Sequence, residues 1–266
     1  MASRTRLDAE LVRRRLARSR DQAADLISAG RVAVAGLPAV KAATQVTQDA
    51  AITVAEAASG KDYASRGGRK LEGALRAFAG LTVAGRRCLD AGASTGGFTD
   101  VLLRAGAEHV IAADVGYGQL AWELRSDPRV TVLDRVNVRY LTPAQVAPSP
   151  GLVTADLSFI SLTLVLPALA ACAAPEADFV LLVKPQFEVG RGKVGAGGVV
   201  RDPRQRAAAV ASVAAAAHEI GLGVAGIAAS PLPGPSGNVE YFLWLRRAAP
   251  PLDHAALQRA IAEGPS

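Results

Sequence analysis

The chain has 266 residues, enough for one large α/β domain or for a medium domain with a smaller one. Its net charge is +6 with a sequence pI of about 9.7, which favours a polyanionic partner such as nucleic acid. The two cysteines, Cys88 and Cys172, exclude a disulfide framework. The start lacks the apolar core of a secretory signal, and no apolar run is long enough to span a membrane. We therefore expect a cytoplasmic protein with no membrane partner.

Residues 6–54 predict a small α+β unit. Apolar side chains recur at helical spacing over about 7–16 and again over about 20–29, which indicates two short amphipathic helices. The next stretch, "RVAVAGLPAV", predicts two strands with a turn at Gly36–Pro38, and "QDAAITV" predicts a third strand.

Arginines crowd around this helix pair. A lone arginine more often belongs to a solvated helix face, but six around one helix–turn–helix predict a surface that faces phosphates. These six are Arg13, Arg14, Arg15, Arg18, Arg20 and Arg31.

The stretches "RLDAELVRR" and "SRDQAADLISAGRVAVAG" resemble the S4 RNA-binding domain, in which such a helix pair lies against structured RNA. Ala35 departs from that family, which often has asparagine in this turn. With the basic side chains near the second domain and its glycine-rich loop, the expected RNA-binding residues are Arg6, Arg13, Arg14, Arg15, Arg18, Arg20, Arg31, Arg66, Arg69, Arg191 and Lys193.

From about residue 65 to 247, strand and helix signals alternate. Apolar runs of four to seven residues are typical of strands buried on both faces of a parallel sheet, and seven of them predict a doubly wound, Rossmann-like fold. The last two strands can form an antiparallel pair at one edge. The seven stretches are "GRRCLDAG", "HVIAADVG", "VTVLDR", "LVTADLSF", "FVLLVKP", "VAGIAAS" and "EYFLWLR".

The first of these strands leads into "DAGASTGG", a glycine-rich turn followed by a helix. The turn lacks the G-x-G-x-x-G spacing of a dinucleotide fingerprint and the lysine of a P-loop. S-adenosylmethionine suits it better, because the acid Asp90 fits a cationic ligand. Asp114 follows at the spacing expected for an acid that binds ribose hydroxyls, and Asp134 with Asn137 offers polar groups to an adenine edge.

The alternative is that these acids only cap the helices that follow them. Because the strand ends meet at one rim of the sheet, the ordered set favours a methyl-donor site. The expected cofactor-binding residues are Asp90, Gly92, Ser94, Thr95, Gly96, Gly97, Phe98, Asp114, Asp134 and Asn137.

The chemical group that accepts the methyl group can be narrowed down, because motifs typical of base methylation are missing from the sequence. The fourth strand ends in "TADLSF", without the prolines commonly associated with methylation of a base amine, and neither cysteine is well placed to attack a pyrimidine carbon. A ribose hydroxyl fits better, since ammonium groups held by carboxylates can stabilise the developing alkoxide. The candidate catalytic residues are Lys70, Asp156, Lys184 and Glu240.

The motifs "SRGGRKLEGAL", "LDAGASTGGFTDVLL", "ADLSFISL", "LVKPQFEVG" and "GNVEYFLWL" together resemble the TlyA family. Its members are S4-containing ribosomal RNA 2′-O-ribose methyltransferases with an FtsJ-like catalytic domain, some of them labelled haemolysins. The resemblance implies that Lys184 acts on the 2′-hydroxyl and that Asp156 sets its charge state. Lys70 and Glu240 would complete the site and orient the ribose. Val136 is a small departure, since related sequences tend to have threonine there.

The resemblance implies an S4-like domain over residues 1–56, a linker over 57–64, a methyltransferase domain over 65–250 and a C-terminal helix and tail over 251–266. It implies methylation of cytidine in 16S or 23S ribosomal RNA, or both, by a monomer or weak dimer without a metal. The glycine-rich segment 186–203 would order over RNA or cofactor, or else be a flexible connector. An RNA-binding protein with an inert methyltransferase domain and a membrane-lytic protein remain the alternatives.

Overall fold

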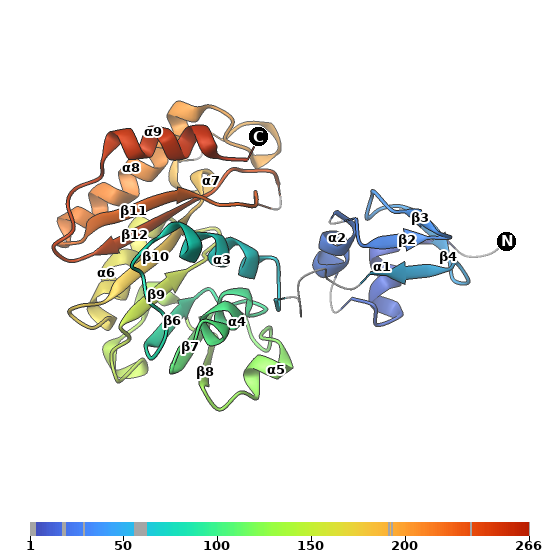
Figure 1. Ribbon diagram of the computed structural model, residues 1–266, viewed down its shortest axis with the longest axis horizontal. Helices are drawn as coiled ribbons and strands as arrows, with labels where there is room; N and C mark the ends of the chain where they lie inside the picture. The colour runs from blue at the N-terminus through green and yellow to red at the C-terminus, as the bar shows by residue number, and fades with distance from the viewer. Residues whose placement is uncertain are drawn as a thin grey trace. The chain divides into compact units, whose positions relative to one another are not determined.

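The computed structural model describes residues 4–17, 20–28, 30–55, 63–190, 192, 194–234 and 236–265. The chain divides into two compact units, Met1–Arg66 and Gly67–Ser266, and each is described by itself (Figure 1). Three predicted RNA-binding residues and most of the predicted linker lie outside the described residues: Arg18, Arg191, Lys193 and residues 57–62.

The N-terminal unit packs two helices against short antiparallel strands (Figure 1). Helices α1 (Leu7–Arg13) and α2 (Arg20–Ser28) lie where the apolar spacing predicts them, and Leu7, Leu11 and Ile27 bury their shared face. The strands are β1 (Arg4–Arg6) paired with β4 (Gln45–Thr47), and β2 (Val32–Val34) paired with β3 (Leu37–Pro38) and β5 (Ile52–Val54).

The hairpin turn of this unit lies one residue earlier than predicted. Ala35 and Gly36 have φ of +50° and +79°, as in the primed two-residue turns that join antiparallel strands. Pro38 is therefore part of β3 instead of the turn. An alanine in this left-handed region costs on the order of 1 kcal/mol, a cost that is smaller for asparagine.

The second unit is built on a seven-stranded sheet in the order β11-β12-β10-β9-β6-β7-β8. Neighbours from β8 to β10 pair in parallel, whereas β12 is antiparallel to both β10 and β11. The predicted antiparallel pair is confirmed, and β12 lies inside the sheet while β11 forms the edge. The strands are β6 (Arg87–Ala91), β7 (His109–Asp114), β8 (Val130–Asp134), β9 (Leu152–Ala155), β10 (Asp178–Val183), β11 (Gly223–Ala229) and β12 (Tyr241–Arg246).

Helices cover both faces of this sheet, as its two-sided burial predicts. On one face, α6 (Leu162–Cys172), α8 (Pro203–Glu219) and α9 (His254–Glu263) share one core with alternate strand residues. On the other face, α3 (Gly67–Ala77) packs against α4 (Gly97–Arg104). Short helices α5 (Trp122–Arg125) and α7 (Pro185–Glu188) follow two strand ends. Within the described residues, no helix is long and apolar enough to cross a membrane.

Candidate active site

The four candidate catalytic residues come from four elements and form two ion pairs. Val183 of β10 pairs with Tyr241 of β12, so Lys184 and Glu240 lie next to each other at the carboxyl end of β10. Asp156 directly follows the carboxyl end of the neighbouring parallel strand β9. Lys70 is supplied by α3. The sheet order therefore brings together residues that are up to 170 positions apart in the chain.

The pair of Lys184 and Asp156 reaches the surface. The Lys184 Nζ lies 2.6 Å from Asp156 Oδ1 and donates a hydrogen bond of 3.0 Å to Ser158 Oγ. The Asp156 side chain is 22% exposed, and that of Lys184 is 10% exposed. An ammonium group fixed at the rim in this way can stabilise a negative oxygen that comes within hydrogen-bond distance.

The pair of Lys70 and Glu240 is sealed. Lys70 Nζ lies 2.5 Å from Glu240 Oε2, and the two side chains are 5% and 0% exposed. A close approach of α3 to the loop before β12 makes this possible, because a Cβ added at Gly73 would lie 2.6 Å from Pro231 Cγ. This pair therefore lies behind the surface, and its contact with a ribose stays a prediction.

The glycine-rich turn lies directly against the acid of the exposed pair. Gly92 has a φ of +86°, and a Cβ added there would lie 2.7 Å from the carbonyl oxygen of Asp156. Only glycine combines this backbone conformation with this approach. The turn that was predicted to hold a methyl donor and the residues that were predicted to hold its acceptor are thus side by side.

The predicted acids of the second and third strands do lie at the same rim. Asp114 accepts hydrogen bonds from the backbone N–H groups of Ser94 and Gly116, at 2.8 Å and 2.7 Å. It thereby ties the glycine-rich turn to the end of β7. Asp134 lies 2.8 Å from the guanidinium of Arg125, whose hydrogen bond lowers the pKa of Asp134.

The other predicted cofactor-binding residues make different contacts within the protein. Asn137 uses its side-chain oxygen to accept from Arg139 N–H and begin a short helical turn. Phe98 is 3% exposed and packs on Phe242 beneath α4, so only its backbone faces the turn. Thr95 accepts a backbone hydrogen bond from Ala121 through its carbonyl oxygen. Gly96 and Gly97 lie at the start of α4.

Asp90 points into the protein. Its side chain is fully buried, and it accepts a 2.7 Å hydrogen bond from Thr99 Oγ1 on α4 and a 3.5 Å one from Thr154 Oγ1 on β9. Burial raises its pKa to about 7, with the nearby charge of Asp156 adding to the effect. Asp90 was predicted to meet a cationic ligand, but its carboxyl group instead braces the two elements on either side of the turn.

A pH dependence of stability follows from this burial. The folded-state pKa of Asp90 lies above the unfolded value, so the native state binds more protons and stability falls as pH rises from about 4 to about 7. Between pH 5 and pH 8, this group should lower the free energy of unfolding of the wild type by roughly 2–3 kcal/mol. We expect Asp90→Asn to abolish this decrease, because asparagine does not titrate. Urea unfolding at several pH values measures it. The exposed Glu176→Gln should keep the wild-type slope, and an equal slope in Asp90→Asn would contradict the account.

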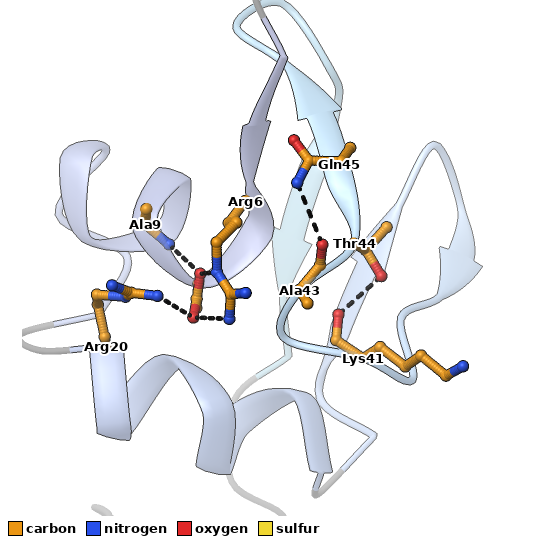
Figure 2. A network of polar contacts seen from close by, with 8 residues as sticks. Arg6, Ala9, Arg20, Lys41, Ala43, Thr44 and Gln45 are labelled. Carbon is orange, nitrogen blue, oxygen red and sulfur yellow. Dashed lines mark hydrogen bonds and ion pairs between the residues drawn. The ribbon is translucent and has the colours of Figure 1, made fainter.

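The arginines of the N-terminal unit are organised by two buried acids that the charge count did not reveal. Asp8 is 4% exposed and accepts from Arg6 and Arg20 at 2.9 Å and 3.0 Å. Figure 2 shows these two side chains and the backbone N–H of Ala9 converging on one carboxylate. The hydrogen bonds from Arg6 are the largest cause of a pKa of about 2 for Asp8, well below its usual value, and the bond from Arg20 adds to this effect. Burial acts in the opposite direction but is the weaker influence.

Glu10 holds a second arginine pair. Arg13 and Arg14 lie 2.6 Å and 2.7 Å from its carboxylate. Arg14 also donates to the carbonyl oxygens of Ala50 and Gln48, so much of its hydrogen-bonding capacity is used within the unit. Arg13 keeps a half-exposed side chain that RNA could reach.

The remaining predicted RNA-binding residues lie in different parts of the chain. Arg31 donates to the carbonyl oxygen of Ala55, and Arg15 has a φ of +60° at the end of α1. Arg66 precedes α3, and Arg69 is an exposed residue of that helix, next to Lys70.

Two residues near the tetrad of Lys70, Asp156, Lys184 and Glu240 were missed in the sequence. Ser158 bonds Lys184, and its position two residues after Asp156, in the segment that follows β9, was the available signal. Asn238 is 2% exposed and bonds both Val200 N–H and the carbonyl oxygen of Gly198, each at 2.9 Å. The end of the glycine-rich segment is therefore held close to Glu240.

Comparisons with known proteins agree with this arrangement. The model of the FtsJ-like methyltransferase family matches residues 63–247, and that of the S4 domain matches residues 5–52. The chain is 63% identical to the 16S/23S rRNA (cytidine-2′-O)-methyltransferase TlyA of Mycobacterium tuberculosis, over 100% of both chains. It is 43% identical to the putative rRNA methyltransferase YqxC of Bacillus subtilis, over 92% of this chain and 86% of the relative.

A solved structure, described as a putative hemolysin from Streptococcus thermophilus, superposes with a TM-score of 0.78 at 36% identity, covering 99% of this chain and 96% of that one. Two domain matches, full-length relatives and a superposed structure thus agree with the motifs read from the sequence. The chain therefore belongs to the TlyA family of S4-containing, FtsJ-like methyltransferases.

Proposed function

We propose that this protein transfers a methyl group from S-adenosylmethionine to a ribose 2′-hydroxyl of ribosomal RNA, with cytidine as the modified nucleoside. The observation that carries the proposal is the pair of Lys184 and Asp156, which reaches the surface directly beside the glycine-rich turn. The relatives named for ribosomal RNA methylation support the choice of substrate.

The residues of the rim fit the methyl donor. The missing side chain of Gly92 lets the turn pack directly against the Asp156 carbonyl, and Asp114 holds the turn in place through Ser94 N–H. The bound donor would supply an electrophilic methyl group on a positively charged sulfur. The 2′-hydroxyl oxygen would accept that methyl group and would give up its proton to solvent.

The Lys184 ammonium would stabilise the oxygen as negative charge develops on it. Asp156 and Ser158 fix the direction of that ammonium group, at 2.6 Å and 3.0 Å. The sealed pair of Lys70 and Glu240 braces the neighbouring strand end from behind. Neither cysteine is placed to attack a substrate, because Cys88 and Cys172 are both fully buried. Burial also raises the pKa of the Cys88 thiol to about 12.

The N-terminal unit would dock folded ribosomal RNA through the half-exposed guanidinium groups of Arg6, Arg13 and Arg20. An enzyme that acts on ribosomal RNA would work in the cytoplasm, and we expect it to act there as a monomer or weak dimer.

The chemistry of the product gives a direct test. A 2′-O-methyl group removes the nucleophile of alkaline RNA cleavage, so the linkage on its 3′ side survives alkali. Ribosomal subunits incubated with the protein and methyl-labelled S-adenosylmethionine should yield alkali-resistant labelled dinucleotides. Label recovered only in mononucleotides would contradict ribose methylation.

Binding of the methyl donor should depend on Gly92. We expect Gly92→Ala to raise the Kd for S-adenosylmethionine at least about tenfold, because the added Cβ meets the Asp156 carbonyl and forces the turn to move. Isothermal titration calorimetry measures it. Gly80→Ala is the matched control, since Gly80 also has a left-handed φ, +93°, but open space around it. Equal affinities for the two variants would contradict the placement of the donor.

A further inference from the structure

Two segments that carry the exposed ion pair leave neighbouring parallel strands. One runs from Asp156 after β9 to Ser161 before α6, and the other runs from Lys184 after β10 to Glu188 at the end of α7. All residues of both segments are described, and the hydrogen bonds that join one to the other use side chains. Beyond the strand ends, the geometry of the pair thus depends on these side-chain contacts.

Glu188 closes the far end of this arrangement. Its Oε2 accepts from Ser161 Oγ at 2.5 Å, and its Oε1 accepts from the backbone N–H of Leu162 at 2.8 Å. Leu162 is the first residue of α6, whose N-terminal N–H groups have no partner within the helix. A carboxylate is favoured there by the helix dipole.

The two segments are therefore joined at both ends. Lys184 bonds Asp156 and Ser158 at the strand side, and Glu188 bonds Ser161 and Leu162 at the helix side. Between them, the rings of Phe159 and Phe187 lie 5.2 Å apart.

The middle contact is weakly supported by the rest of the fold. Phe159 is 92% exposed and has a φ of +64°, a conformation that a bulky residue keeps only when its surroundings impose it. The hydrogen bonds of Ser158 to Lys184 and of Ser161 to Glu188 hold the chain on both sides of Phe159 and can impose it.

We propose that Glu188 is a positioning residue for methyl transfer, which acts by holding the segment after Lys184 against the segment after Asp156. The proposal rests on the proposed function. Misplacing a catalytic group by about 1 Å can cost about 10²-fold in rate. We expect Glu188→Ala to lower kcat by about 10- to 100-fold while the KM for RNA and the Kd for S-adenosylmethionine change less than about twofold.

Glu188→Gln should rescue most of the rate. Its Oε1 can accept from Leu162 N–H while its Nε2 donates to Ser161 Oγ, so both links are kept without the charge. Glu176→Ala, which removes an exposed carboxylate from the turn before β10, is the control and should keep the wild-type kcat. A purely structural role would lower the amount of folded protein in proportion, with the rate per donor-binding site unchanged.

A second readout does not need the reaction. The Lys184 side chain is 10% exposed, and we expect Glu188→Ala to speed its acetylation by an amine-reactive ester severalfold, with Lys70 unchanged, as followed by mass spectrometry. If Glu188→Ala does not fold, Ser161→Ala takes its place, since it removes the Ser161 Oγ link to Glu188 and keeps the Leu162 N–H link. It also removes the cap that Ser161 Oγ provides to Thr163 N–H, so Thr163→Ala, which keeps that cap, is its control.

Three results would overturn the proposal: a kcat of Glu188→Ala within twofold of Glu176→Ala, a Gln variant as slow as the Ala variant, or unchanged acetylation of Lys184. Failure of the proposed function looks different. The wild type would then place no methyl group on ribose, whereas the acetylation comparison would still report whether Glu188 holds the segment.

Discussion

Replacing Lys184 by alanine is expected to lower kcat for methyl transfer by about 10²–10³-fold, because it removes the ammonium group that we propose stabilises the developing alkoxide. Lys184 is held by Asp156 and Ser158 at the exposed rim, so its loss leaves no sealed charge and folding should persist. RNA affinity should stay close to wild type, since most of the predicted RNA-binding arginines are in the other unit. Steady-state methylation of ribosomal subunits and a filter-binding assay measure the two quantities.

The matched control is Lys41→Ala, an exposed lysine of the N-terminal unit. It can weaken RNA binding and raise KM, but it should leave kcat unchanged. A Lys184→Ala variant that methylates at the wild-type kcat would contradict the catalytic assignment. A variant that loses RNA binding would show that Lys184 serves docking instead.

Replacing Lys70 by methionine is expected to destabilise the second unit by about 3–5 kcal/mol, because it leaves Glu240 charged, buried and unpaired. The two side chains are 5% and 0% exposed, so water cannot compensate. The double variant Lys70→Met with Glu240→Gln should recover most of that stability. It should remain slow in methyl transfer, because the pair that braces the strand end beside Lys184 is gone.

Urea unfolding followed by tryptophan fluorescence measures this cycle. Both tryptophans of the chain, Trp122 and Trp244, belong to the second unit, so the signal follows that unit alone. A single variant within about 1 kcal/mol of wild type would contradict the buried ion pair. A fully active double variant would show that the pair serves stability and not catalysis.

The strands of the second unit could be predicted because each contains apolar residues in a short run, and those in the middle of the sheet, such as β9 and β10, are buried on both faces. Their order could not be read in the same way. That β12 lies between β10 and β11 depends on pairing partners far apart in the chain. In the first unit, β1 and β4 have three residues each and too little pattern to be found.

The candidate site could also be predicted only in part from the sequence. The family resemblance named the four residues of the tetrad, and the structure adds that one of its pairs is open and the other sealed. The sequence predicted that Asp90 lies at the end of its strand, but it did not show in which direction the side chain points. The strand's alternation turns it towards Thr99, nine residues ahead.

Charge counts gave a similarly partial account of the arginines. The net charge predicted a polyanionic partner, and the helix pair predicted where the arginines gather. The sequence did not show that Asp8 and Glu10 lie buried beneath them and fix their directions. Those carboxylates leave Arg13 half-exposed and draw Arg14 into contacts with backbone carbonyls.

The central claim is that the methyl group goes to a ribose of ribosomal RNA. The most direct measurement incubates 16S and 23S RNA, within purified subunits, with the protein and S-adenosylmethionine that carries a deuterated methyl group. Nuclease digestion and tandem mass spectrometry then separate the base from the sugar of each nucleoside. We expect a deuterated methyl group on the ribose of cytidine. A deuterated methyl group on a base, or none on either RNA, would contradict it.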